Sequence, residues 1–176
     1  MNWWGKILGA FLGFGVANIF GAIIGIWIGH QFDKGLSADF SSMNAADQEK
    51  IQASFFATTF QLLGHVAKAD GRVTESEIAA AEGVMSHLGL NADLRKSAIE
   101  HFNQGKQANF DWRKPLSEFA ELARRQRNLK QMFIEIQIQV AFADGSIEAK
   151  EQNLIFEFAR VLGFSKLLIQ QLIVMI

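Results

Sequence analysis

The longest apolar run of the chain lies near its N-terminus and predicts a membrane-spanning helix. Residues 7–29 contain no charged side chain, and Asn18 is the only polar residue among them. A helix needs about 20 apolar residues to cross the hydrocarbon core of a bilayer. A cleaved signal peptide is the alternative, but it has a shorter apolar core that ends at a small-residue cleavage site. Leu36-Ser37-Ala38 matches such a site poorly, so we expect an uncleaved anchor.

Small residues recur at every fourth position of this run and form a ridge along one face of the predicted helix. Such a ridge lets a second membrane helix approach closely, and packing between the two backbones favours their association. We therefore expect the anchor to pair with a second copy of the chain. The alternative is a lone anchor that is merely rich in glycine. The ridge consists of Gly5, Gly9, Gly13, Ala17, Gly21, Gly25 and Gly29.

The rest of the chain has the composition of a helical domain. Residues 1–34 hold the anchor and its flanks, residues 35–47 form a polar linker, and residues 48–176 are long enough to bury one sizeable core. The chain has one proline and no tyrosine, which argues against a turn-rich sandwich of strands. Its many Ala, Leu, Glu, Gln and Lys residues favour helices.

Apolar residues three and four positions apart predict where these helices lie. The first is expected over about residues 46–69. Thr74 and Glu77 match a capping box at the start of the second, and Asn91 suits the N-cap of the third. Pro115 fits the first turn of a fourth helix, and a last helix is expected from Ser165 to the end.

Residues 134–140 fit two structures. They alternate apolar and polar side chains as a strand does, yet the wider segment also carries an apolar stripe at helical spacing. An internal repeat decides between them, because residues 66–77 are similar to residues 140–151. Both copies read Ala-Asp-Gly-x-(Val/Ile)-x-x-x-Glu after a predicted helix. We therefore predict an all-α fold, with one transmembrane helix followed by a bundle of about seven helices that has an internal two-fold repeat.

The carboxylates of the repeated motif allow two interpretations. Gly and Glu stand at the sixth and twelfth positions of an EF-hand loop, but no carboxylate stands at its first or third position, so neither copy is an EF-hand. One interpretation is structural, since Gly can end a helix, Asp can accept from turn amides and Glu can complete a capping box. The other is a divalent-cation site, with no other cofactor required. Its candidate ligands, if the loops face each other, are Asp70, Glu77, Asp144 and Glu151.

The one basic cluster of the sequence also allows two interpretations. Its residues are Arg124, Arg125, Arg127 and Lys130. They can be the solvated end of a helix, where cations complement the helix dipole. Alternatively, they can contact a partner or anionic lipid. The net charge of −1 gives no field that favours nucleic acid, so we expect no nucleic-acid partner.

Catalytic chemistry has little support in the sequence. The absence of cysteine excludes disulfides, thiolate metal sites and cysteine nucleophiles. The four histidines are scattered without metal-ligand spacing, and the sequence has no nucleophile elbow, phosphate-binding loop or His-Glu-x-x-His motif. We therefore expect that the chain is not an enzyme.

Several uncommon stretches of the chain occur together, in order, in a known family. They are residues 4–6, 28–34, 55–60, 71–75, 133–139 and 141–145. With these stretches the chain resembles the DjlA family, the membrane-anchored DnaJ-like co-chaperones of Gram-negative bacteria. The region after the anchor resembles the TerB-like (tellurite-resistance) helical domain within that family.

The resemblance implies a single-pass protein of the bacterial inner membrane, with a short periplasmic N-terminus and a cytoplasmic helical domain. Charge alone leaves the orientation open, because Lys6 and Lys34 lie on opposite sides of the span. The resemblance also implies dimerisation through the anchor. It further implies that the acidic positions of the repeated motif bind a divalent cation.

The family also implies a C-terminal J domain, whose His-Pro-Asp motif stimulates the ATPase of the chaperone DnaK. The only proline here, Pro115, follows Lys114, so that motif is absent. The chain is then a part of a longer protein or a relative without that arm. We expect the anchoring, dimerising and regulatory part of a co-chaperone for DnaK (Hsp70). The alternative is a free-standing, membrane-bound TerB-like protein without chaperone activity, which binds metal or takes part in the response to stress or tellurite.

Overall fold

Helices form all the regular structure of residues 45–174, which are the residues that the computed structural model describes. The all-α prediction is confirmed for this part of the chain. The predicted span at residues 7–29 and its small-residue ridge lie outside it. Among residues 45–174, no helix is both long enough and apolar enough to cross a membrane. The seven helices are α3 (Ala45–Ala67), α4 (Glu75–His87), α5 (Ala92–Gly105), α6 (Arg113–Leu122), α7 (Arg127–Ala141), α8 (Ala149–Val161) and α9 (Lys166–Val174).

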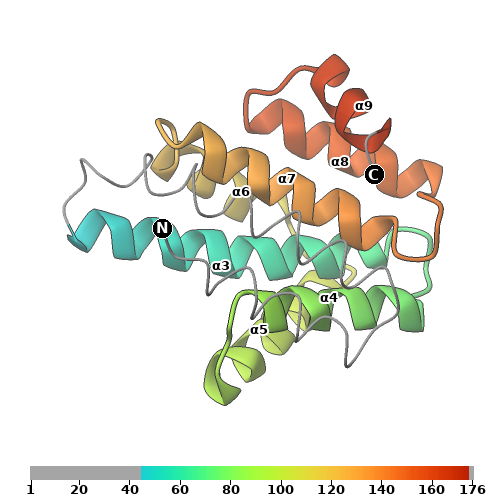
Figure 1. Cartoon of the computed structure of the whole chain (residues 1–176), viewed down its shortest axis with the longest axis horizontal. Coiled ribbons are helices and arrows are strands. Elements are labelled where there is room, and N and C mark those ends of the chain that lie inside the picture. The colour runs from blue at the N-terminus through green and yellow to red at the C-terminus, as the bar shows by residue number, and fades with distance from the viewer. Residues whose placement is uncertain (1–44, 175–176) are drawn as a thin grey trace, which may run out of the picture.

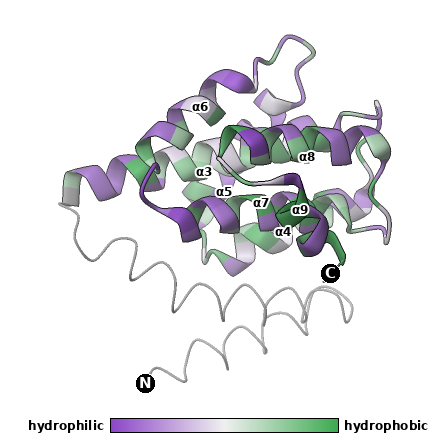
Figure 2. Ribbon diagram, turned by 90° about the horizontal axis from the view of Figure 1, so that it is seen from above, coloured by the Kyte–Doolittle hydropathy of each residue, from purple (hydrophilic) through white to green (hydrophobic). Residues whose placement is uncertain are grey.

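Helix α3 runs through the middle of the molecule between two groups of helices, which also meet where α4 contacts α7. Figure 1 shows α4 and α5 on one side of α3, and α6, α7, α8 and α9 on the other. Hydrophilic and hydrophobic residues alternate around α6 and α8 in Figure 2, as expected for helices with one solvent-facing side. In α6, for example, Leu116 and Phe119 are buried, whereas Glu118 and Glu121 are exposed.

The segment with strand-like alternation is helical, as the repeat predicted. It belongs to α7, which is buried at every position from Met132 to Ala141. Polar side chains therefore lie in the interior beside apolar ones, and their alternation does not mark a solvent-facing side. The Gln137 amide, for instance, donates a hydrogen bond to the backbone carbonyl of Thr59 in α3 (3.2 Å).

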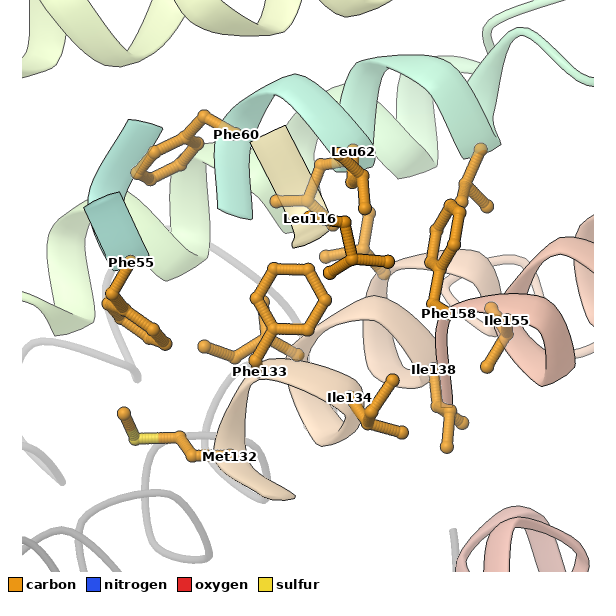
Figure 3. Close-up of a cluster of buried hydrophobic side chains, with 14 of the residues drawn as sticks. Phe55, Phe60, Leu62, Leu116, Met132, Phe133, Ile134, Ile138, Ile155 and Phe158 are labelled. Atoms are coloured by element: carbon orange, nitrogen blue, oxygen red, sulfur yellow. The ribbon is translucent and has the colours of Figure 1, made fainter. Parts of the chain in front are cut away.

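Aromatic side chains join α3, α6, α7 and α8 into one core (Figure 3). The ring of Phe119 lies between Phe55 and Phe133, with centroid distances of 5.9 and 5.4 Å. Trp112, just before α6, packs edge-on against Phe158 of α8 at 4.9 Å. Such aromatic pairs contribute roughly 0.5–1.5 kcal/mol each beyond the area they bury.

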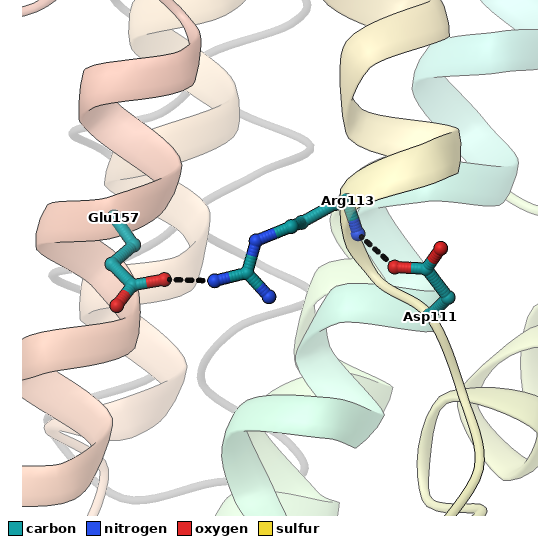
Figure 4. A network of polar contacts seen from close by, with 3 residues as sticks. All are labelled: Asp111, Arg113 and Glu157. Atoms are coloured by element: carbon teal, nitrogen blue, oxygen red, sulfur yellow. Dashed lines mark hydrogen bonds and ion pairs between the residues drawn. The ribbon is translucent and has the colours of Figure 1, made fainter.

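A polar contact on the surface also joins α6 to α8. The guanidinium of Arg113 lies 2.9 Å from the carboxylate of Glu157, and the Arg113 backbone N–H donates to Asp111 (Figure 4). The side chains of Arg113 and Glu157 are 62% and 43% exposed, so the ion pair contributes at most about 1 kcal/mol. The buried aromatic rings therefore contribute more to this junction.

Two glycines bring α3 and α5 into backbone contact. A β-carbon added to Gly64 would collide with the backbone carbonyl of Phe102, and one added to Gly105 would collide with the backbone carbonyl of Gln61. Burial lowers the pKa of His65, beside Gly64, and the positive charge of Arg113 lowers it too, while a hydrogen bond to the backbone of Gly105 opposes the shift. We call the backbone contact of α3 and α5 at Gly64 and Gly105 the glycine crossing.

Replacing either glycine of the crossing with alanine tests this packing. Gly64→Ala and Gly105→Ala should each destabilise the protein by about 2–3 kcal/mol, because the added methyl group meets main-chain atoms that no rotamer change can move. The measurement is unfolding of the detergent-solubilised full chain, followed by circular dichroism.

Gly83→Ala in α4 is the matched control, because open space surrounds a β-carbon at that position. It should stabilise the protein by about 0.5–1 kcal/mol, the helix preference of Ala over Gly. Equal effects of the three substitutions would contradict the glycine crossing.

Candidate functional site

The two copies of the repeated motif form loops with the same local geometry. In the α3–α4 loop the Asp70 carboxylate accepts a hydrogen bond from the backbone N–H of Arg72 (2.8 Å). In the α7–α8 loop the Asp144 carboxylate accepts one from Ser146 (3.1 Å). The glycine after each Asp has a φ angle of +95° or +92°, a left-handed conformation that glycine adopts without strain. The turn chemistry predicted for both motifs is therefore present.

The glutamates of the two motifs cap the helices that follow. In α4, the Thr74 hydroxyl accepts from the backbone N–H of Glu77 (3.2 Å), and the Glu77 carboxylate accepts from the backbone N–H of Thr74 (2.8 Å). At the start of α8, the Glu151 carboxylate accepts from the backbone N–H of Glu148 (3.0 Å). These contacts confirm the predicted capping box of α4, and they explain both glutamates without a ligand.

The two capping glutamates also face each other, although capping carboxylates are ordinarily solvated. The residues Glu77 and Glu151 are each only 5% exposed, and they lie close enough for their carboxylates to interact. Burial raises the pKa of Glu151 to about 7, the negative charges of Glu77 and Asp70 raise it too, and the hydrogen bond from the Glu148 backbone opposes the shift. Two carboxylates this close do not both ionise easily, so Glu151 keeps its proton to a higher pH than an isolated glutamate does.

The structure brings the four predicted metal ligands together only in part. Glu77 and Glu151 meet, and Asp70 is near enough for its charge to act on Glu151. The Asp144 carboxylate binds the amide of its own loop. Among residues 45–174, no group of three or more His, Asp or Glu side chains is arranged to hold a metal ion. Occupation of these positions by a cation stays a prediction.

One buried acid was missed from the sequence. Glu135 in α7 is 4% exposed, and burial raises its pKa, although the Gln131 amide donates a hydrogen bond to its carboxylate (2.8 Å) and opposes the shift. Its position in the polar-apolar alternation of residues 134–140 concealed it. The sequence carries no signal that separates Glu135 from a surface glutamate. The difference appears only in the structure, where every position of α7 from Met132 to Ala141 is buried.

The basic cluster occupies the corner between α6 and α7. Arg124 and Arg125 follow the C-terminus of α6, where cations complement the helix dipole as expected. Arg127 and Lys130 instead lie in the first turn of α7, at the positive end of its dipole. The dipole interpretation therefore explains only half of the cluster.

The cations of this corner have few counter-charges among residues 45–174. Arg124 lies 3.8 Å from Glu121, with both side chains largely exposed. The guanidinium of Arg127 lies over the ring of Phe164, 5.6 Å from its centroid. Burial lowers the pKa of Lys130, and the neighbouring positive charge of Arg127 lowers it further. This set of four cations is called the basic corner below.

Comparisons with known proteins match both parts of the chain. The family model described as Tellurite resistance protein TerB matches residues 56–172, and the Co-chaperone DjlA transmembrane domain matches residues 1–39. No solved structure matches the chain significantly.

Curated relatives agree with these matches. The chain is 41% identical over 167 residues to Co-chaperone protein DjlA of Yersinia pseudotuberculosis, which covers 94% of this chain and 60% of the relative. It is 39% identical to the DjlA protein of Escherichia coli, with 94% and 61% covered, and 40% identical to that of Legionella pneumophila, with 94% and 57% covered. The chain thus spans about 60% of the length of these relatives. The helical domain and the N-terminal segment together show that the chain belongs to the TerB family and is a relative of the DjlA co-chaperones, with a DjlA-type transmembrane domain at its N-terminus.

Proposed function

We propose that this chain is the membrane-anchoring, dimerising and regulatory part of a DjlA-like co-chaperone for DnaK (Hsp70). The observation that carries the proposal is the order of the two family matches along one chain, the DjlA transmembrane domain over residues 1–39 and TerB over residues 56–172. The matching relatives are named as co-chaperones, which supports a role other than catalysis. The J domain that would recruit DnaK lies C-terminal to these residues in this proposal.

The proposed topology places the short N-terminus in the periplasm and the helical domain in the cytoplasm, with one span in the inner membrane. The match to the DjlA transmembrane domain supports an anchor at this end of the chain. The small-residue ridge from Gly5 to Gly29 supports pairing of two anchors. Paired anchors would hold two helical domains, and whatever follows them, side by side.

A second proposed function is binding of a divalent cation between the two motif loops. The neighbouring carboxylates of Glu77 and Glu151 support it, because a divalent cation can neutralise the repulsion that raises the pKa of Glu151. Asp70 would add a nearby negative charge, and Asp144 would join only if its loop turned toward the pair. The same site would serve a free-standing TerB-like metal or stress-response protein without a chaperone link, which is the alternative function.

The proposal assigns anchoring to this chain and DnaK stimulation to a J domain, and this predicts the effect of the chain on DnaK. The purified chain should leave the ATPase rate of DnaK unchanged, because it contains no His-Pro-Asp motif. The same chain extended by the J domain of a DjlA relative should stimulate that rate. The control is an extended chain in which the J-domain motif is replaced by alanines. Stimulation by the chain alone would contradict the proposal, and failure of the extended chain would favour the free-standing alternative.

The small-residue ridge predicts self-association of the anchor. Replacing Gly13, Gly21 and Gly25 with leucine should abolish pairing, because the bulky side chains prevent the two backbones from approaching. The measurement is energy transfer between labelled copies of the full chain in vesicles. Leucine at Phe11, Val16 and Ile23, which lie off the ridge, is the matched control and should leave pairing intact. Pairing that survives in the ridge variant would rule out this dimer.

The glutamate pair predicts how stability depends on pH. The pKa of Glu151 is about 7 in the folded state and about 4.5 in the unfolded chain, so the folded state binds the proton of Glu151 more tightly. The resulting stability is fully present below pH 4.5 and is lost as the pH rises through about 7, by up to about 3 kcal/mol at about 1.36 kcal/mol per pKa unit. Glu151→Gln should remove the part of this dependence that comes from Glu151 and leave the smaller part that comes from Glu135, because an amide keeps both the cap and the contact with Glu77. The measurement is urea unfolding of the full chain between pH 4 and pH 9.

The cation proposal is tested by repeating the urea unfolding in the presence of a divalent cation. At the upper end of the pH range, calcium, magnesium or zinc should restore the stability that deprotonation removes, and the Glu151→Gln chain should not respond. Glu75→Gln, which changes an exposed carboxylate in the same turn of α4, is the matched control and should behave as the unaltered chain. A response to none of the three cations would reject the metal site. A flat pH profile of the unaltered chain would reject the raised pKa of Glu151.

A further inference from the structure

The basic corner lies at the end of the bundle where the chain enters it. Phe55 in the N-terminal half of α3 packs against Phe119 of α6, which packs against Phe133 of α7. Figure 1 shows the start of α3 and the α6–α7 connection at the same end of the molecule. The 15 residues between position 29 and the start of α3 at Ala45 reach at most about 50 Å. An anchor at residues 7–29 therefore keeps the bundle within about 50 Å of the bilayer, and this end is the one nearest to the anchor along the chain.

The charges of this corner suit an anionic surface rather than the protein itself. Residues 121–131 contain four cations and one carboxylate, whereas the whole chain has a net charge of −1. That carboxylate, Glu121, is 76% exposed and 3.8 Å from Arg124, so solvent screens most of the attraction. Arg127 and Lys130 are repelled by the dipole of the helix that they begin. Contacts within the described part of the chain thus give little reason for the full set.

An apolar side chain accompanies these cations. Leu122, the last residue of α6, is 43% exposed. Basic residues with an exposed leucine among them are the combination found on protein segments that lie at the headgroup level of a membrane.

We propose that the basic corner binds the anionic headgroups of the bilayer in which the chain is anchored, with Leu122 at the lipid interface. This inference rests on the proposed membrane anchor. Contact at this corner fixes the bundle against the membrane by its α6–α7 end. The two motif loops, whose turns begin at Asp70 and Asp144, then point away from the lipid, because α3 and α7 both start at the membrane end and run toward those loops (Figure 1).

A fluorescent probe on the full chain tests this contact. The chain has no cysteine, so Leu122→Cys provides a single site for an environment-sensitive dye. The labelled chain is placed in vesicles of phosphatidylcholine, or of phosphatidylcholine with phosphatidylglycerol, that contain a headgroup quencher. We expect quenching only with phosphatidylglycerol, and its loss at 1 M salt, where the Debye length falls to about 3 Å. A dye at Ser146→Cys, in the exposed α7–α8 loop, should stay unquenched in every vesicle.

Charge removal supplies the decisive comparison. The double substitution Arg124→Gln, Arg125→Gln should lower the ratio of lipid-bound to unbound basic corner about 25-fold. This is roughly a fivefold loss for each basic side chain. Arg127 is left in place because it stacks on Phe164. Arg72→Gln with Lys150→Gln removes the same charge from exposed positions beside the motif loops, and this matched control should keep the quenching.

The outcomes separate this inference from the anchor on which it rests. Flotation of the chain with the vesicles is measured first, and failure to float would contradict the anchor itself. If the chain floats, equal quenching in both lipids, or none in either, would overturn the inference. Quenching that survives in the Arg124→Gln, Arg125→Gln chain would overturn it too. A basic corner that serves an acidic protein instead gives no quenching in pure lipid, which is one of these overturning results.

Discussion

Complete burial of one helix is the constraint around which the other helices are arranged. Every position of α7 from Met132 to Ala141 is buried, so neighbours must surround it and no side of it can be left to solvent. Burying polar side chains is costly unless they form hydrogen bonds, and Gln137 meets this need by donating to Thr59 of α3. The aromatic contacts of Phe119 and Phe133 then hold α6 against the same core. The repeated motif follows α7 directly, so its position depends on this packing.

The motif loops show how one residue can serve both structure and function. Glu77 and Glu151 each complete the first turn of a helix, a local role that would be met equally well at a solvated surface. Burying both in one place adds an electrostatic cost, which protonation of Glu151 reduces. A protein that needed only the caps would gain stability by exposing them. The proximity of these two carboxylates is the feature of residues 45–174 on which the cation proposal rests.

Local signals in the sequence were sufficient to predict most of the helices of the helical domain and two of their N-caps. Thr74 and Asn91 cap α4 and α5 as predicted, because a capping side chain bonds to amides within three residues of itself. The helical state of α7 could also be predicted, but only from the repeat, since its own alternation favours a strand.

Relations between distant residues could not be predicted in the same way. No spacing indicates that Glu77 and Glu151 meet, because the packing of four helices decides it. The dipole explanation of the basic cluster was wrong for Arg127 and Lys130, because the sequence did not show where α6 ends and α7 begins. The burial of Glu135 could not be predicted for a related reason, since a single sequence does not show how many neighbours a helix has.

The glycine crossing has an evolutionary consequence. A collision between two side chains can be relieved by a second substitution that shortens the partner. At Gly64 and Gly105 the obstructing atoms are main-chain carbonyls of the opposite helix, and every amino acid carries that carbonyl. No compensating replacement of Phe102 or Gln61 is available, so each glycine is constrained independently of its partner's identity. Descendants of this sequence can change the side chains around the crossing freely, but a larger residue at either position requires α3 and α5 to move apart.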